Sequence, residues 1–118
     1  TRKRTLFPYT TLFRSRIEDG DGWGSLLLDI SEGGQAEVID NRFQQSARAG
    51  NRTAIGFAGE SRDRSSPEHA LRVEGNSFVN EGGAATFVRN HTSAPALLRG
   101  NRLPARGVTA LRGPGSVE

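Results

Sequence analysis

The sequence contains no cysteine and no methionine, and its 118 residues include one tryptophan, one tyrosine and six phenylalanines. Without cysteine the chain has neither a disulfide framework nor a thiolate metal site. No uninterrupted aliphatic run is longer than Leu26, Leu27 and Leu28, far short of a membrane-spanning helix. A chain of this length allows one small domain.

Lysine is equally scarce, since its single copy is Lys3, in an N-terminal segment unlike the rest of the chain. Residues 5–15 (TLFPYTTLFRS) resemble the translation of a short-read sequencing adapter, which matches codon by codon in one reading frame. We interpret residues 1–15 as a non-native, adapter-derived segment and exclude them from fold reasoning, as is done for tags. We therefore expect this segment to pack poorly or to lie apart from the coils.

A clear excess of charge of one sign is missing once that segment is set aside. Four of the 16 basic residues fall within residues 1–15, so the remainder carries 12 arginines against 13 acidic residues, a net charge of −1. Nucleic-acid binding favours a basic stripe with interleaved aromatic residues, and this mixed pattern argues against it. Arginine without lysine, together with abundant glycine and alanine, indicates a GC-rich bacterial genome.

What the chain does contain is a repeat centred on asparagine. Residues 36–43 (AEVIDNRF) align with 71–78 (LRVEGNSF) and 96–103 (ALLRGNRL), one asparagine in each copy. Apolar residues stand five and three positions before the asparagine and two positions after it. This period of two, broken by one turn, is typical of a strand with one buried face that continues past a corner.

A second repeated segment follows each asparagine block, with the sequences TAIG (53–56), TFVR (86–89) and TALR (109–112). The first of these is followed by extra polar residues, and we interpret 59–68 (GESRDRSSPE) as an inserted surface loop. Stacked copies would place equivalent apolar residues in contact, in three columns. The columns are Val38, Val73 and Leu98; Phe43, Phe78 and Leu103; and Ile55, Val88 and Leu111.

The succession of strand, asparagine corner and strand resembles the right-handed parallel β-helix, or pectin-lyase-like, family over about residues 24–113. The resemblance implies an all-β fold, a right-handed parallel β-helix solenoid whose strands pair with the equivalent strands of the next coil. A leucine-rich repeat is the alternative, because Leu71, Val73, Asn76 and Phe78 also satisfy its core motif. The return segments separate the two, since they are strands in a β-helix and helical or 3₁₀ in a leucine-rich repeat.

The three asparagines are expected to form a structural ladder. Asn41, Asn76 and Asn101 stand at equivalent positions, so their amides can bond from coil to coil. Asparagine also tolerates the left-handed backbone conformation that a sharp corner requires. We therefore assign the three side chains to the fold and not to a ligand.

We expect a fragment of about four coils from a bacterial protein, secreted or at the cell surface. Residues 16–25 would form a loop that leads into the first coil. In this loop Asp19 and Asp21 begin like a calcium-binding loop but lack its later ligands, so we interpret them as a turn. The coils would span 26–52, 53–85, 86–108 and 109–118.

The family includes polysaccharide lyases, glycoside hydrolases and noncatalytic surface proteins, so its fold alone does not select a function. We expect a surface or carbohydrate-interacting protein. One alternative is part of a lyase or hydrolase, which needs two or three carboxylates and an arginine within about 5–10 Å on one exposed strand face. A second is a leucine-rich-repeat binding module.

Outward positions supply the candidate binding residues. Glu74, Arg89, Arg99 and Arg102 are predicted to form a patch that binds an acidic polysaccharide, and the competing interpretation is a set of ordinary cross-strand charge pairs. No catalytic set of the family can be matched to this chain. His69 and His91 are single histidines without neighbouring ligands, so neither a metal site nor a cofactor is expected.

Overall fold

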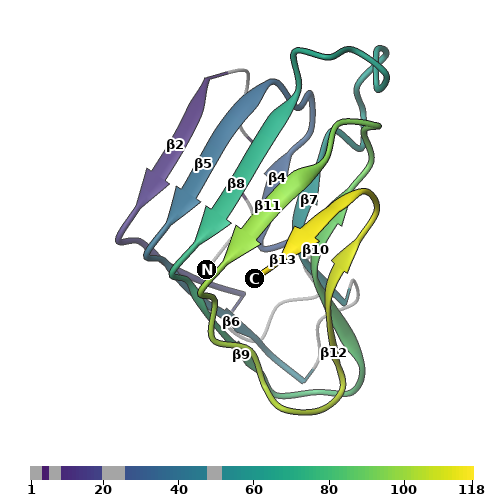
Figure 1. Cartoon of the computed structure of the whole chain (residues 1–118). Helices are drawn as coiled ribbons and strands as arrows, with labels where there is room; N and C mark the ends of the chain where they lie inside the picture. The colour runs from purple at the N-terminus through teal and green to yellow at the C-terminus, as the bar shows by residue number, and fades with distance from the viewer. Residues whose placement is uncertain (1–3, 6–8, 20–25, 48–51) are drawn as a thin grey trace.

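The computed structural model describes residues 4–5, 9–19, 26–47 and 52–118, and every regular element in these ranges is a β-strand. Each pair of adjacent strands is parallel, so the fold is all-β with parallel sheets (Figure 1). Burial alternates along β5 (Gln35–Ile39) and β8 (Ala70–Glu74), as the period of two predicts.

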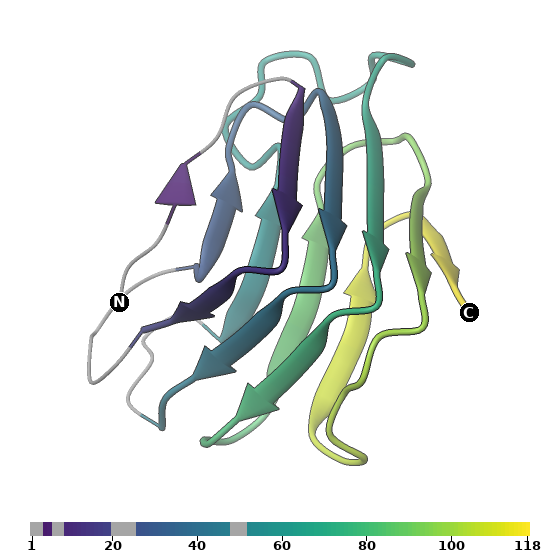
Figure 2. The same cartoon turned by 90° about the vertical axis from the view of Figure 1, so that its left-hand side faces the viewer.

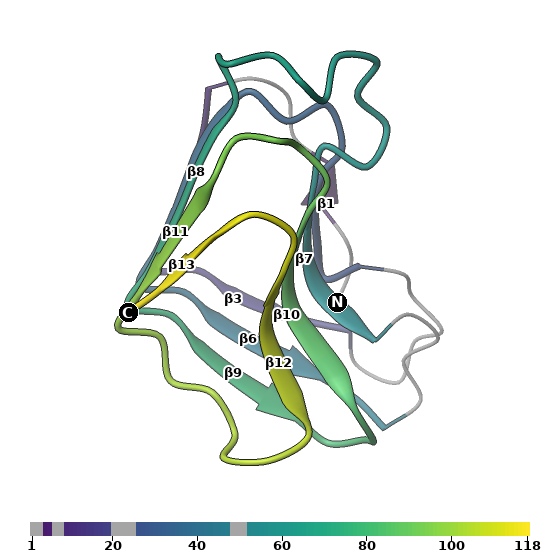
Figure 3. The same ribbon diagram turned by 45° about the vertical axis from the view of Figure 1, so that its right-hand side comes forward.

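The strands of the described residues form three sheets, which lie on three sides of a common interior (Figure 3). Sheet A contains, in spatial order, β1 (Arg4–Thr5), β4 (Leu28–Ile30), β7 (Thr53–Phe57), β10 (Ala85–Asn90) and β12 (Val108–Arg112). Sheet B contains β13 (Gly115–Val117), β11 (Ala96–Arg99), β8, β5 and β2 (Thr10–Phe13). Sheet C contains β3 (Arg16–Glu18), β6 (Arg42–Gln45) and β9 (Ser77–Asn80).

The chain visits sheets A, B and C in the same order each time, and we call one such visit a rung. β4, β5 and β6 make one rung, and β7, β8 and β9 lie beside them in the next (Figure 2). In the rung of β10 and β11, a single bridge between Ser77 and Arg102 stands where sheet C would continue. The expected coils, 26–52, 53–85, 86–108 and 109–118, each begin within two residues of a sheet A strand.

The described residues of the N-terminal segment belong to a further rung, contrary to the expectation that residues 1–15 pack poorly or lie apart from the coils. β2 pairs with β5 along its whole length, and β1 pairs with β4. β3 pairs with β6, so the expected loop over 16–25 begins with a strand, while residues 20–25 lie outside the described residues. Thr10 and Leu12 are buried and alternate with exposed neighbours, and this pattern lets the segment pair. The described stack therefore has one rung more than the four expected.

We expect a chain that lacks residues 1–15 to fold, with a free energy of unfolding lower by about 2–3 kcal/mol. Within this segment Leu12 is buried, whereas Tyr9 and Phe13 are 81% and 54% exposed. Each unit of a stack contacts only its neighbours, so the loss stays at that end. Urea unfolding followed by circular dichroism measures the difference. If the truncated chain is unfolded in buffer, the segment is indispensable and its interpretation as an adapter-derived addition is wrong.

The corner between sheets B and C turns at the residue before each asparagine. Asp40, Gly75 and Gly100 have φ values of 57°, 66° and 65°, in the left-handed region. The asparagines that follow them do not have positive φ, so the prediction that they adopt this conformation is wrong. Glycine adopts it without steric cost, and aspartate tolerates it better than most residues. The asparagine side chain is thereby left to bond to the neighbouring rung.

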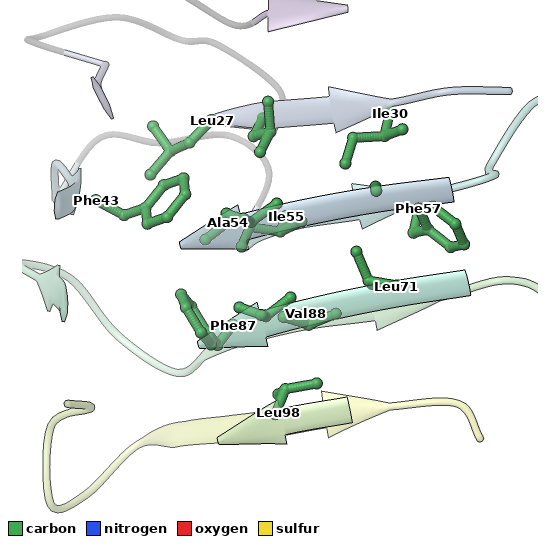
Figure 4. Close-up of a cluster of buried hydrophobic side chains, with 14 of the residues drawn as sticks. Leu27, Ile30, Phe43, Ala54, Ile55, Phe57, Leu71, Phe87, Val88 and Leu98 are labelled. Atoms are coloured by element: carbon green, nitrogen blue, oxygen red, sulfur yellow. The ribbon is translucent and has the colours of Figure 1, made fainter. Parts of the chain in front are cut away.

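The interior is filled by apolar columns that run across the rungs (Figure 4). Val73 pairs with Val38 on one side and with Leu98 on the other. In the other two predicted columns, Phe43 pairs with Phe78, Val88 pairs with both Ile55 and Leu111, and Leu103 packs against the core as a partly buried residue. The vertical contact that the repeat predicts is therefore present in all three sheets.

The polar insertion forms a surface loop between β7 and β8, as predicted for residues 59–68. His69 anchors its end, because its Nδ1 accepts a hydrogen bond from the backbone N of Gly34 at 2.9 Å. Its Nε2 lies 2.6 Å from the carbonyl oxygen of Asp63, and Phe57 packs against the ring edge. Both ring nitrogens of His69 are thus engaged within the protein.

The segments that return the chain to sheet A are the strands β7, β10 and β12. A leucine-rich repeat would have helix or 3₁₀ structure there, so this observation argues against that alternative. Across the described ranges, no helix has the length and apolar character needed to cross a membrane.

Candidate functional site

The four residues predicted to form one binding patch are divided among the faces of the stack. Glu74 in β8 and Arg99 in β11 are register partners on sheet B. Arg102 is bridged to Ser77, where sheet C begins, and Arg89 lies in β10 of sheet A. The structure brings Glu74 and Arg99 together on sheet B and places Arg89 on sheet A. Consecutive strands of one rung belong to different sheets, so residues close in the sequence can face different sides of the stack.

The asparagines form a hydrogen-bonded column across the rungs. Asn76 Oδ1 accepts hydrogen bonds from the backbone N of Asn41 at 2.8 Å and from its Nδ2 at 3.0 Å. Asn101 Oδ1 accepts the same pair from Asn76, at 2.9 and 3.0 Å. In the first rung Ser15 stands at this position, and its backbone N donates to Asn41 Oδ1 at 2.9 Å. These amides are occupied by the fold, since Asn41 and Asn76 are 2% and 0% exposed.

The outer face of sheet B carries charges of both signs that pair within a strand and between strands. Arg72 donates from Nη1 to Glu37 Oε2 at 2.5 Å and from Nε to Glu74 Oε2 at 2.8 Å. Arg99 Nη2 lies 3.3 Å from Glu118 Oε1. These side chains are partly exposed, so each pair contributes at most about 1 kcal/mol to stability. Glu74 is therefore paired with Arg72 of its own strand, and Arg99 with Glu118 directly after β13.

Glu37, Arg72 and Glu74 nevertheless meet the composition that an enzyme would need on one strand face, two carboxylates and an arginine. Both carboxylates bind the same guanidinium, which neutralises it. A lyase requires a cationic side chain that is open to a uronate, and in this conformation the guanidinium of Arg72 is occupied by both carboxylates.

The outer face of sheet A is different, because its hollows are lined by arginine and not by carboxylate. Arg89 in β10 and Arg112 in β12 are register partners. Beside them lies an open hollow of about 420 Å³, lined by Arg89, Asn90, His91, Arg112 and Gly113. A second hollow, of about 240 Å³, extends across the threonines of the same strands to Arg52. We call the surface made by Arg52, Thr86, Arg89, His91 and Arg112 the arginine face.

Arg89 is exposed and, within the described parts of the chain, its guanidinium has neither a hydrogen bond nor an ion pair. Arg112 donates from Nε to Thr86 Oγ1 at 3.0 Å, which leaves its two terminal nitrogens for other partners. Like charges placed directly across a strand pair are destabilising. Arg89 and Arg112 are thus held in register, and the described lining of their hollows contains no carboxylate that would neutralise them.

Arg52 closes the other end of the arginine face and has a structural task. It donates from Nη1 to the Ser46 carbonyl oxygen at 2.9 Å and from Nη2 to that of Gly83 at 3.1 Å, and it also bonds to Asn80 Oδ1. All of these acceptors are uncharged, so the positive charge of Arg52 remains uncompensated by them. It adds to the field of the face while its side chain is fixed in place.

His91 lies beside these arginines and is affected by their charge. Its pKa is lowered below its usual 6.5 by burial, and the charges of Arg89 and Arg64 lower it further. The imidazole is therefore uncharged at neutral pH. Arg64 comes from the inserted loop, where its guanidinium bonds to the carbonyl oxygen of Gly59.

Of the arginine face, only Arg89 is among the predicted binding residues. The prediction groups it with Glu74 and Arg99 of sheet B and with Arg102, which lies where sheet C begins. The signal for Arg112 was present in the repeated segments TFVR and TALR, which place an arginine at the same position in consecutive rungs. Arg52 and His91 carry no such signal, because the loops that position them are not part of the repeat.

Scans of protein families, curated proteins and solved structures found no match to this chain. Within the described ranges, no group of three or more histidine, cysteine, aspartate or glutamate residues is arranged to hold a metal ion. The candidate site is therefore defined by its own geometry.

Proposed function

We propose that this chain is part of a right-handed parallel β-helix at a bacterial cell surface or in a secreted protein, and that it binds an acidic polysaccharide on the arginine face. The observation that carries the proposal is the register pairing of Arg89 and Arg112 beside hollows whose described lining contains no carboxylate. A polymer with an acidic group on each sugar would supply the missing counter-charge.

The β-helix part of the proposal is supported by three parallel sheets visited in a fixed order and by columns of equivalent residues. Stacking at the ordinary strand spacing, about 4.8 Å, repeats a given outward position at regular intervals. A regular ligand such as a polysaccharide suits such a surface, since its acidic groups also recur at regular intervals.

The acidic part of the proposal follows from guanidinium chemistry. Arginine binds a carboxylate through two parallel hydrogen bonds and remains charged at all working pH values. Among the described residues, no hydrogen bond or ion pair occupies the donors of Arg89 or the terminal nitrogens of Arg112. Neutral polysaccharides lack the group that these donors recognise best, so we expect discrimination between acidic and neutral polymers.

The proposal is tested by titrating the protein with polygalacturonate and with dextran in a calorimeter at low salt. We expect binding to polygalacturonate alone, and weaker binding as added salt screens the exposed charges. Replacing both arginines, Arg89→Gln with Arg112→Gln, should raise Kd about 30-fold, which corresponds to about 1 kcal/mol for each exposed guanidinium. Stability without ligand should change by less than about 0.5 kcal/mol, because these two side chains repel each other.

The matched control removes two positive charges elsewhere, through Arg42→Gln with Arg102→Gln. Both side chains are exposed and belong to the sheet C side. The two double variants are compared at about 0.15 M salt, where the control should bind polygalacturonate with less than about a threefold change in Kd, because attraction by net charge is largely screened. Equal losses in the two double variants would mean that attraction is nonspecific, and the arginine face would not be the site.

Part of a lyase or hydrolase is the alternative function, favoured by the meeting of Glu37, Arg72 and Glu74 on sheet B. It is tested in the same samples, by following the chain length of the polymer after long incubation. Cleavage that disappears in Glu37→Gln and Glu74→Gln, and persists in the Arg89 and Arg112 double variant, would favour the alternative over binding alone.

A further inference from the structure

We infer that His91 is a third cationic member of the binding site, taking up a proton when a carboxylate of the ligand enters the hollow between Arg89 and Arg112, so that affinity rises as pH falls. This inference rests on the function proposed above. It assigns to His91 a role that neither its isolation in the sequence nor the repeat suggests.

The first step is the position of the imidazole. His91 directly follows β10, and its backbone N donates to the Phe57 carbonyl oxygen at 3.0 Å, which fixes the chain at this point. The ring lines the same hollow as Arg89 and Arg112. A group bound by the two guanidiniums would therefore lie beside the ring.

The second step is the absence of competing partners. The two histidines differ here, because His69 uses both ring nitrogens within the protein, whereas no side-chain hydrogen bond or ion pair of His91 exists within the described residues. Its Nε2 lies 3.6 Å from the place where a Cβ on Gly59 would stand. The ring therefore lies close to the backbone of the inserted loop.

The third step is the charge around the ring. Among the described residues, the charged groups that face it are Arg89 in β10, Arg112 in β12 and Arg64 in the inserted loop, all of them cationic. In the free protein these charges and burial lower the pKa of His91, so the proton is disfavoured. A bound carboxylate opposes the same charges and favours the protonated ring.

The sign of the pH effect follows from linkage. Because the ligand raises the pKa of His91, the bound state holds more protons than the free state in the window around and below pH 6.5. Affinity is then lowest where His91 is neutral in both states and increases as pH falls. The carboxyl groups of a polyuronate stay ionised over this range, because their ordinary pKa lies near 4.

The experiment compares the Kd for polygalacturonate at about pH 7.5 and about pH 5.5 in the full chain, in His91→Gln and in His91→Lys. In the unaltered protein we expect Kd to fall about five- to tenfold on acidification. His91→Gln should bind with the high-pH affinity at both values, and His91→Lys with the low-pH affinity at both. Titrations in buffers of different ionisation enthalpy should show proton uptake in the unaltered protein alone.

The outcomes separate the two proposals. If the unaltered protein binds but His91→Gln keeps the same pH dependence, the effect belongs to another group, and the role of His91 is refuted while the proposed function stands. If the unaltered protein does not bind at either pH, the proposed function itself fails. If both His91 variants lose binding at both pH values, His91 serves structure, and the inference is again refuted.

Discussion

Replacing Asn76 with alanine is expected to lower the free energy of unfolding by about 4 kcal/mol. Asn76 is fully buried, and its amide makes four hydrogen bonds to neighbouring rungs. Its loss leaves the backbone N of Asn41, the carbonyl oxygen of Val38 and part of Asn101 without partners. Each buried group left unsatisfied costs about 1–3 kcal/mol.

Urea unfolding followed by circular dichroism measures this loss, and Asn101→Ala is the graded comparison. Asn101 is half-buried, and water can replace part of what its amide provides. We therefore expect about half the cost at Asn101. A loss below about 1 kcal/mol at Asn76 would mean that the column of amides is not a source of stability.

The asparagine column is the part of the fold that the sequence predicts best, and the reason is physical. Inward positions of stacked rungs must hold equivalent side chains, so spacing in the sequence reports contact in space. The same reasoning places the left-handed backbone conformation at the wrong residue of the corner. Asparagine tolerates this conformation, but so do the residues that precede it, Asp40, Gly75 and Gly100, and these are the ones that adopt it. The side-chain amide of the asparagine hydrogen-bonds to the next rung, and the residue before it adopts the left-handed conformation.

The candidate site is less predictable, because outward side chains do not share a core. Glu74 and Arg89 both point outward in the repeat, yet they belong to sheets B and A and meet different neighbours. The rung that contains Thr10 and Leu12 is not predicted, for another reason. Residues 1–15 are excluded because they resemble a translated adapter, yet buried and exposed residues alternate along β2 and allow it to pair with β5.

Sheet A also departs from simple alternation, and Phe87 shows where. Period two would place Phe87 and Val88 on opposite faces, yet both are 0% exposed. The ring of Phe87 lies 5.5 Å from that of Phe78 and 5.9 Å from that of Phe43, so it fills the space in front of sheet C. The triangular interior thus accepts two consecutive side chains of β10.

Replacing Phe87 with alanine is the second change for which we expect a large effect, a loss of about 4 kcal/mol. Removing a buried phenylalanine from a core costs about 3–5 kcal/mol, through lost transfer free energy and the cavity left behind. The neighbouring rungs cannot fill this cavity, because the register of the flanking residues places Ala54 and Ala110 on either side of Phe87. One large ring between two small residues is what keeps this column filled.

The column continues with Leu27 beyond Ala54, so large and small residues alternate from rung to rung (Figure 4). Ala54→Phe should therefore not rescue Phe87→Ala, since the new ring would press on Leu27, and overpacking costs about 1–3 kcal/mol. Phe13→Ala is the matched control, because Phe13 is 54% exposed and its loss should cost less than about 0.5 kcal/mol. Equal unfolding midpoints for the Phe87 and Phe13 variants in urea would show that the ring is not part of the core, and the interior contact between sheets A and C would have to be abandoned.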